Sequence, residues 1–332
     1  MIISRTPFRI SFFGGGTDYP VWYKENGGAV LSASIDKYCY LTCRYLPPFF
    51  EHKTRLAWSK LEAVKEVDEI QHPSAREVIK FLGIKEGLEI HHDADLPARS
   101  GLGSSSSFTV GLLNSLYSLL GKRPTKKQLA LEAIHIEQEL IKENVGSQDQ
   151  AAAAFGGLNK IEFGGKDHIV VTPLELESDA EKNIEDHLML FFTGLARSAS
   201  EIAGEQIRLA PQKTKELESM KAMVDVASSL IKKKNMDDFG KLLHEGWQIK
   251  RTLSPQVTNR SIDEIYERGK SAGALGGKLL GAGAGGFMLF FVKPERQPAV
   301  KAALAKLLYV PAKFEKKGSQ IIFNNGAPVY NS

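Results

Sequence analysis

Apolar residues recur at helical spacing directly after a run of glycines and serines. They occupy every fourth position in the series Phe108, Leu112, Leu116 and Leu120. That spacing places them on one face of a helix. Upstream, residues 88–92 form a short strand-like run, which Pro97 ends. The pattern predicts a strand, a loop over residues 97–107 and a helix in succession.

Strands and helices are predicted along the rest of the chain from the same two periodicities. Strands are expected at residues 2–3, 9–13, 29–33, 38–45, 188–192 and 287–292. One helix is expected after Pro73 and another over about 211–252. Two more are expected to begin at an N-cap, one at Thr125 and one at a capping box formed by Ser261 and Glu264. The charged, apolar-poor stretch 179–186 indicates a seam between two domains.

One carboxylate falls on a predicted apolar helix face. The residues that share this face are Ala130, Ile134, Glu137 and Ile141. Burial of a carboxylate without a partner is costly. Glu137 is therefore either a metal ligand, or a residue that lies at the edge of the apolar stripe or pairs with a basic side chain. Glu139 belongs to the solvated face and is not a candidate.

The stretch 97–107 has the composition of an anion site. Its glycines and serines open a helix, whose first N–H groups are unpaired and lie at the positive end of the helix dipole. Gly101 and Gly103 let a ligand approach the backbone, and the serine hydroxyls can donate to phosphate oxygens or ligate Mg²⁺. The alternative is a glycine-rich turn with a serine N-cap. A Walker A loop is excluded because no Gly-Lys-Ser/Thr sequence is present.

Three other short stretches offer polar groups beside glycines or at a helix start. Gly14–Asp18 follows a strand and is either a close backbone approach to a ligand, with Asp18 as acceptor, or a plain loop. Asp149 follows Gly146 at the start of a small-residue helix, either as a proton acceptor or as a favourable acid at a helix N-terminus. Arg197 with two serines forms either a small anion site or a capped helix.

A late glycine run, residues 281–286, matches the letters of a dinucleotide-binding fingerprint. That fingerprint opens a helix, whereas this run opens an apolar strand, so a Rossmann oxidoreductase is rejected. A protein-kinase loop is also disfavoured, because no Val-Ala-Ile-Lys strand follows. The run is expected to be a glycine loop that packs against a flat or charged partner.

Composition and charge narrow the function classes. The 332 residues carry a formal net charge of +4, with 42% apolar and 25% charged residues, which suits a globular protein of two domains. No dense Lys/Arg block indicates nucleic acid, and no 18-residue apolar segment indicates a membrane span. Cys39 and Cys43 would lie roughly 13 Å apart on one strand, too far for a disulfide. With Arg5 and Arg9 where a signal peptide needs its apolar core, a cytoplasmic protein is expected.

Three motifs in this order resemble those of one kinase superfamily. They are Gly15-Gly16-Thr17-Asp18, the stretch Pro97 to Ser105, and the glycine run 281–286. Together they resemble the galactokinase, homoserine kinase, mevalonate kinase and phosphomevalonate kinase (GHMP) superfamily. Glu137 with Gly146-x-x-Asp149-Gln150 is similar to its sugar-kinase branch, and the runs 7–18 and 143–150 look like bacterial D-glycero-D-manno-heptose 7-phosphate kinases. Ser106-Ser107 depart from the alanines that many members carry.

The resemblance implies an α+β fold of two domains. Residues 1–184 would form an α/β domain similar to ribosomal protein S5 domain 2, with the phosphate loop 97–107. Residues 185–332 would form a ferredoxin-like domain with the glycine loop 281–286. ATP, Mg²⁺ and the substrate would meet between the two domains, and a homodimer is left open.

The resemblance also implies roles for single residues. Asp149 matches the family's catalytic base, Arg9 the cationic residue beside it, and Ser105 and Glu137 the Mg²⁺ ligands. The residues expected at the acceptor substrate are Gly15, Gly16, Thr17, Asp18 and Arg197. The residues expected at ATP are Pro97, Arg99, Ser100, Gly101, Leu102, Gly103, Ser104, Ser105, Ser106, Gly283 and Gly285.

The activity that the resemblance implies is phosphorylation of the anomeric hydroxyl of D-glycero-D-manno-heptose 7-phosphate by ATP, to give the 1,7-bisphosphate. Such an acceptor carries its own phosphate, for which the candidate contacts are Arg76, Arg197, Lys53, Arg55 and His72. Two alternatives remain. One is an anomeric kinase of a neutral sugar such as fucose, and the other is a non-catalytic sugar-binding protein of the same fold.

Overall fold

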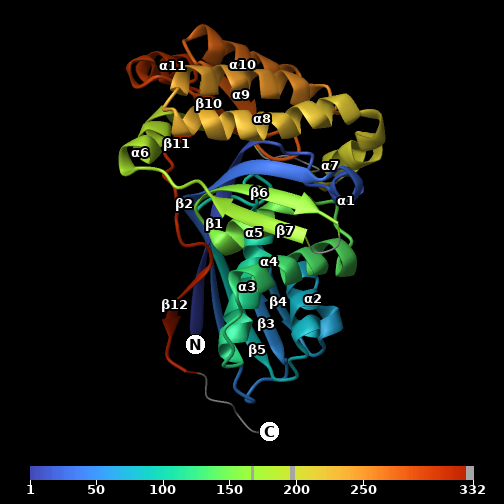
Figure 1. The fold of residues 1–332 in the computed structure, drawn as a ribbon. Coiled ribbons are helices and arrows are strands. Elements are labelled where there is room, and N and C mark those ends of the chain that lie inside the picture. Colours follow the sequence, from blue (N-terminus) through green and yellow to red (C-terminus); the bar gives the residue numbers. More distant parts are fainter. Residues whose placement is uncertain (166–167, 195–198, 327–332) are drawn as a thin grey trace.

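The computed structural model describes residues 1–165, 168–194 and 199–326 of the chain. In these residues the strands form an eight-stranded and a four-stranded sheet (Figure 1). The first sheet contains β1 (Ile2–Phe13), β2 (Gly28–Tyr45), β3 (Thr54–Ala57), β4 (Leu61–Val64), β5 (Leu88–Ala94), β6 (Leu158–Gly164), β7 (His168–Pro173) and β12 (Gln320–Asn324). The second contains β8 (Leu188–Gly194), β9 (Gly276–Leu279), β10 (Gly286–Phe291) and β11 (Leu308–Val310).

The helices follow the same division along the chain (Figure 1). The first group is α1 (Pro20–Asn26), α2 (Pro73–Leu82), α3 (Ser104–Leu119), α4 (Lys126–His135) and α5 (Gln148–Phe155). The second group is α6 (Ser178–His187), α7 (Ala199–Leu209), α8 (Thr214–Lys232), α9 (Met236–Arg251), α10 (Arg260–Ser271) and α11 (Gln297–Ala303). Short 3₁₀ turns lie at Val67–Glu69, Ala210–Gln212 and Pro294–Arg296. No helix in the described ranges is long and apolar enough to cross a membrane.

The second sheet has the strand order β11-β8-β10-β9, and each neighbouring pair is antiparallel. Helices α7 to α10 connect β8 to β9, and α11 connects β10 to β11. This arrangement confirms the ferredoxin-like layout and the α+β class. The late glycine run is the loop between β9 and β10. The chain then returns to the first sheet, where β12 pairs with β1, and the domain boundary near residue 184 stays a prediction.

Strands β1 and β2 are each continuous where the sequence predicts two segments. Their antiparallel ladder shifts register between Pro7, which faces Tyr38, and Phe8, which faces Ile35. The two residues between Ile35 and Tyr38 form a bulge opposite the proline. A bulge accommodates a residue that cannot donate to the ladder, so the pairing resumes on both sides of it.

Three of the predicted helix boundaries can be compared with the structure. Thr125 accepts from the N–H of Gln128 at 3.1 Å and caps α4, as predicted. The expected capping box at Ser261 is wrong, because Asn259 accepts from the N–H of Ile262 at 3.0 Å and starts α10 earlier. The predicted helical stretch 211–252 is two helices, since Lys234 adopts a φ of 56° between α8 and α9.

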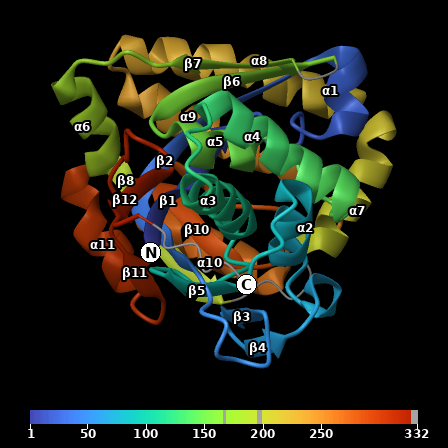
Figure 2. The same ribbon diagram turned by 90° about the horizontal axis from the view of Figure 1, so that it is seen from below.

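Helix α3 is buried around most of its circumference and packs against β1 and β2 (Figure 2). Helix α8 contacts the same two strands from the side of the second sheet (Figure 1). As a result, the loop that leaves β1 and the loop that enters α3 meet beside the β9–β10 loop.

Candidate active site

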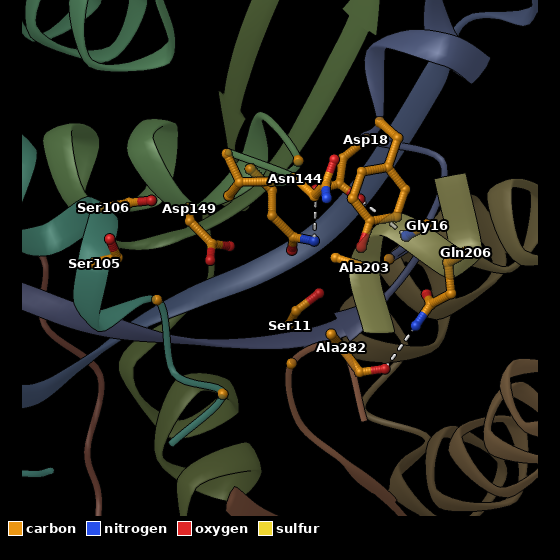
Figure 3. A pocket seen from close by; sticks show the side chains of 18 of the residues that line it. Ser11, Gly16, Asp18, Ser105, Ser106, Asn144, Asp149, Ala203, Gln206 and Ala282 are labelled. Carbon is orange, nitrogen blue, oxygen red and sulfur yellow. Dashed lines mark hydrogen bonds between the residues drawn. The ribbon is translucent and has the colours of Figure 1, made fainter. Parts of the chain in front are cut away.

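A pocket opens where β1 ends and α3 begins (Figure 3). Its walls come from the loop after β1, the phosphate loop (residues 97–103), the segment before α5, helix α7 and the β9–β10 loop. The predicted site residues that line it are Arg9, Gly15, Gly16, Asp18, Arg99, Gly101, Gly103, Ser104, Ser105, Ser106 and Asp149. The structure therefore brings together groups that lie up to 140 positions apart in the sequence.

Other predicted site residues lie behind or beside the pocket. They are Thr17, Pro97, Ser100, Leu102, Glu137, Gly283 and Gly285. The hydroxyl of Thr17 is fully buried and donates to the carbonyls of Gly14 at 2.8 Å and Ala29 at 3.0 Å, so it shapes the loop. A Cβ on Gly283 would lie 2.7 Å from Val257 Cα, so this glycine faces the protein. Arg197 lies outside the described residues.

The phosphate loop leaves the start of α3 open to an anion. Gly103 occupies the N-cap position in a left-handed conformation, with φ 77°, and no side-chain hydrogen bond caps this helix in the described structure. The alternative of a serine-capped turn is therefore wrong. The first residues of α3, Ser104 to Ser106, line the pocket, and no side chain caps their N–H groups, which is the arrangement that binds phosphate at a helix N-terminus.

The β9–β10 loop packs on the phosphate loop, backbone against backbone. A Cβ on Gly281 would lie 2.5 Å from Gly101 Cα, and a Cβ on Gly101 would lie 2.4 Å from the carbonyl oxygen of Leu280. The N–H of Phe287 donates to the carbonyl of Ser100 at 3.1 Å. The late glycine run thus packs on the backbone of the phosphate loop, and glycine is needed there because no side chain fits.

Arg9 joins the phosphate loop to Asp149. Its guanidinium donates from Nε to Asp149 Oδ1 at 2.7 Å and from Nη2 to Oδ2 at 2.8 Å. Its Nη1 donates to the carbonyl of Gly101 at 2.7 Å. Arg9 is 5% exposed, so this two-pronged contact is well shielded from water. Asp149 is held in one orientation, with its carboxylate 3.3 Å from the position of a Cβ on Gly103.

Asp18 provides the second carboxylate of the pocket. Its Oδ1 accepts from the N–H of Gly16 at 2.9 Å, and its Oδ2 accepts from Gln148 Nε2 at 2.9 Å. Burial raises the pKa of Asp18, and the nearby charge of Asp149 raises it further. The two acids thus lie in one pocket, Asp149 beside the phosphate loop and Asp18 beside the loop after β1 (Figure 3).

Glu137 lies beneath the start of α3. Helix α4 ends at His135 and continues as the π-helical turn Ile136–Leu140, which contains this residue. Glu137 Oε2 accepts from Ser106 Oγ at 2.8 Å and from Gln150 Nε2 at 2.5 Å. Burial raises the pKa of Glu137 to about 7. The side chain is fully buried, so it does not lie at a solvated edge.

The oxygen donors around Glu137 suit a divalent cation. The hydroxyl of Thr109 also lies beside this carboxylate and, like Ser106 and Gln150, acts to lower its pKa against the effect of burial. A buried carboxylate beside serine and threonine hydroxyls and a phosphate loop is the hard oxygen donor set that Mg²⁺ prefers. The hydroxyl that donates to Glu137 is that of Ser106, whereas Ser105 is exposed at the pocket wall.

Sequence reasoning missed two lysines of the pocket, Lys250 on α9 and Lys278 on β9. Lys250 follows Phe239, Leu243 and Trp247 at helical spacing, so it lies on the apolar face of α9 as Glu137 does on its own helix. Lys278 is the one charge in the apolar strand that precedes the glycine run. The same test that found Glu137 would have found both.

Two family models match the chain, "GHMP kinases N terminal domain" over residues 67–157 and "GHMP kinases C terminal" over residues 227–310. A D-glycero-alpha-D-manno-heptose 7-phosphate kinase of Campylobacter jejuni is 31% identical over 318 residues, which cover 92% of this chain and 93% of that protein. The chain belongs to the GHMP kinase superfamily. It is an ATP-dependent small-molecule kinase that transfers a phosphoryl group to an alcohol acceptor.

Two further GHMP-type comparisons extend this result. A crystal structure of a D-glycero-D-manno-heptose 1-phosphate kinase from Bacteroides thetaiotaomicron superposes with a TM-score of 0.77 and 25% identity, over 100% of both chains. A bifunctional fucokinase/GDP-fucose pyrophosphorylase of Arabidopsis thaliana is 26% identical over 314 residues, which are 86% of this chain and 29% of that protein. The GHMP kinase fold therefore accounts for the whole length of this chain.

Gly146 tests whether the position of Asp18 matters to the kinase. A Cβ at this residue would lie 1.9 Å from Asp18 Oδ2, so Gly146→Ala must displace the carboxylate. We expect kcat/KM for the acceptor to fall on the order of 10²-fold, the usual effect of a misplaced contact, while ADP affinity stays within about two-fold. Gly165→Ala is the matched control, because its Cβ would meet nothing within 4 Å. Equal activity of the two variants would contradict a role for Asp18 at the acceptor.

Glu137 tests the cost of a buried carboxylate in the metal-free protein. Its pKa rises from 4.5 to about 7 on folding, so the cost to stability is absent below about pH 4.5 and complete above about pH 7. In EDTA, we expect Glu137→Gln to increase the free energy of unfolding at pH 8 by up to about 3 kcal/mol and so to raise the unfolding temperature. At pH 5 the substitution should change both quantities little. Glu139→Gln, on the exposed side of the same turn, should change neither value. If Glu137→Gln lowered the unfolding temperature at pH 8, the view that the ionised Glu137 carboxylate destabilises the metal-free protein would be wrong.

Proposed function

We propose that this chain transfers the γ-phosphoryl group of Mg²⁺-bound ATP to the anomeric hydroxyl of D-glycero-D-manno-heptose 7-phosphate. The observation that carries the chemistry is the Arg9–Asp149 pair, which fixes a carboxylate next to the open helix start of the phosphate loop. The similarity to the Campylobacter jejuni heptose 7-phosphate kinase, 31% over 92% of this chain, supports the choice of sugar.

The phosphate loop would bind the β- and γ-phosphates of ATP. The N–H groups at the start of α3 and the hydroxyls of Ser104 and Ser105 would be the donors on this side of the pocket, since the hydroxyl of Ser106 donates to Glu137. Phosphoryl transfer requires mainly positioning and neutralisation of charge. Glu137 and Ser105 would hold Mg²⁺, with Ser106 as the hydroxyl already in contact with that carboxylate, and the ion supplies charge neutralisation when bound.

Asp149 would accept the proton of the attacking hydroxyl. A general base needs hydrogen-bond reach to the proton and a fixed orientation, and the bidentate contact with Arg9 provides the orientation. Asp18, Gly15 and Gly16 form the opposite wall and would bind the ring hydroxyls of the sugar. Asp18 retains acceptor capacity there, because each of its oxygens accepts one hydrogen bond, from Gly16 and from Gln148, and a carboxylate can accept more.

A second candidate is an anomeric kinase of a neutral sugar such as fucose. Four of the basic residues considered for the acceptor's phosphate do not line the pocket: Lys53, Arg55, His72 and Arg76. Arg76 donates instead to Glu77 and to the carbonyl of Ile70, and Arg55 to Glu89. This observation and the fucokinase similarity favour the alternative, so the acceptor panel below includes fucose.

The proposal is tested by ADP release with Mg²⁺ and ATP against a panel of acceptors. The panel contains D-glycero-D-manno-heptose 7-phosphate, sedoheptulose 7-phosphate, fucose, galactose and mevalonate. We expect turnover with the manno-heptose phosphate, and Asp149→Asn should lower it by 10² or more while ATP binding stays nearly intact, on the scale usual for a catalytic base.

The panel separates the possible outcomes. Turnover only with fucose would replace the sugar and keep the kinase. Turnover that Asp149→Asn does not change would remove Asp149 from the role of base. ATP binding without turnover on any acceptor would contradict the proposed reaction and favour a sugar-binding member of the fold.

A further inference from the structure

Two ammonium groups are buried at the floor of the pocket with carbonyl oxygens as their partners. Lys250 is 6% exposed and Lys278 is 5% exposed. Lys250 Nζ donates to the carbonyls of Leu279 at 3.2 Å and Gly281 at 2.5 Å, and Lys278 Nζ donates to the carbonyl of Phe12 at 2.8 Å. Among the described residues, neither lysine is within ion-pair distance of a carboxylate. An ammonium group has three donors, so Lys278 in particular has donors left over.

The surroundings of these lysines favour an incoming anion. Burial lowers the pKa of Lys250 to about 8 and lowers that of Lys278 well below 10.5, and the neighbouring cations Arg9 and, for Lys278, Lys250 lower them further. Asp18 is the one acid that opposes the effect on both lysines. A bound anion would offset the cost of burying both ammonium groups.

Two neutral polar atoms of the same pocket also lack a partner. The hydroxyl of Ser11 and Oε1 of Gln148 are buried and accept or donate no hydrogen bond within the part of the chain that is described. Both residues line the pocket, and Ser11 Oγ and Gln148 Nε2 each lie 3.6 Å from the position of a Cβ on Gly15. Buried polar atoms without partners are uncommon in folded proteins and point to a ligand at this place.

Backbone contacts link Lys250 to the phosphate loop. Gly281, whose carbonyl accepts from Lys250, lies against Gly101 of that loop, and the carbonyl of Gly101 accepts from Arg9, which in turn holds Asp149. Lys278 lines the same pocket, and the charges of Arg9 and Asp18 act on both lysines. The γ-phosphorus of ATP on the phosphate loop would move toward an acceptor oxygen at Asp149, within the pocket that both lysines line.

We propose that Lys250 and Lys278 are catalytic residues that donate hydrogen bonds to the oxygens of the phosphoryl group during its transfer. The inference rests on the phosphoryl transfer proposed above but not on the identity of the sugar. In this step the bond from the γ-phosphorus to the bridging oxygen breaks and leaves ADP. The acceptor oxygen forms the new bond to phosphorus, and its proton passes to Asp149. The charge on the three remaining phosphoryl oxygens is what the lysines would stabilise.

The test compares Lys250→Met and Lys278→Met with Lys270→Met. Lys270 also donates to a backbone carbonyl, that of Leu275 at 2.7 Å, but does not line the pocket. We expect each pocket variant to lower kcat by 10²–10³-fold, the usual loss for one donor to a charge that develops in the transition state. KM for the acceptor and affinity for ADP should stay within about three-fold, and the control should match the wild type.

A binding measurement carries the test independently of turnover. Titration calorimetry with Mg²⁺, ADP and aluminium fluoride, which imitates the transferred phosphoryl group, should show at least ten-fold weaker binding for both pocket variants, with affinity for ADP alone retained. If the wild type phosphorylated none of the acceptors, the proposed reaction would be contradicted. Binding of the aluminium fluoride complex would still show whether the two lysines contact the transferred group. If Lys278→Met does not fold, Lys278→Gln takes its place in the experiment, because glutamine keeps a donor for the Phe12 carbonyl.

Two results would overturn the inference. One is unchanged kcat and unchanged binding of the aluminium fluoride complex in the pocket variants. The other is a rise in KM that appears only with phosphorylated acceptors, at unchanged kcat, which would assign the lysines to the acceptor's own phosphate.

Discussion

The site depends above all on the buried guanidinium of Arg9. It donates to both oxygens of Asp149 and to the carbonyl of Gly101, and the backbone N–H of the same residue donates to the carbonyl of Leu102 at 3.0 Å. One residue of β1 therefore fixes the phosphate loop by two contacts and the start of α5 by two more. Since a buried guanidinium without partners would be costly, these contacts hold one another in place, and the distance between the loop and Asp149 is determined by the arginine.

The second constraint is the close approach of the two glycine loops. Because Gly101 and Gly281 leave no room for a side chain, the loop of the ferredoxin-like part lies directly on the loop that precedes α3. Lys250 donates a hydrogen bond to the carbonyl of Gly281 and so fixes the β9–β10 loop in this contact. This side of the pocket is thus built by both sheets together. A change in the seating of one sheet on the other would alter the phosphate loop, even though that loop belongs to the first sheet.

The features that could be predicted from sequence are those set by local spacing. The strand, loop and helix around residues 97–107 follow from apolar periodicity, and the burial of Glu137 follows from its place on an apolar face. Contacts between segments that lie far apart in the sequence could not be predicted in the same way. The partner of Glu137 is Ser106 at the position that often carries alanine in the family, and the π-helical turn that directs Glu137 inward leaves no periodic signature. Two wrong predictions also depend on neighbouring residues. The helix after Ser261 starts earlier because Asn259 provides the cap, and the strands expected at residues 2–3 and 9–13 are one strand because a bulge in β2 accommodates Pro7.

Buried charged side chains are concentrated in and directly behind the pocket, so this region departs from ordinary core composition. Arg9, Asp18, Glu137, Lys250 and Lys278 are all at least nine-tenths buried, and only Arg9 among them has a full ionic partner in the described structure. A core built for stability alone would replace such groups with apolar side chains of the same volume. Their retention is the expected cost of a site whose charges are fixed before the ligand arrives, because donors that need not reorganise stabilise a developing charge most strongly. Buried carboxylates elsewhere are matched locally, as Glu89 is by Arg44 and Arg55, whereas the lysines of the pocket have no carboxylate within ion-pair distance among the described residues.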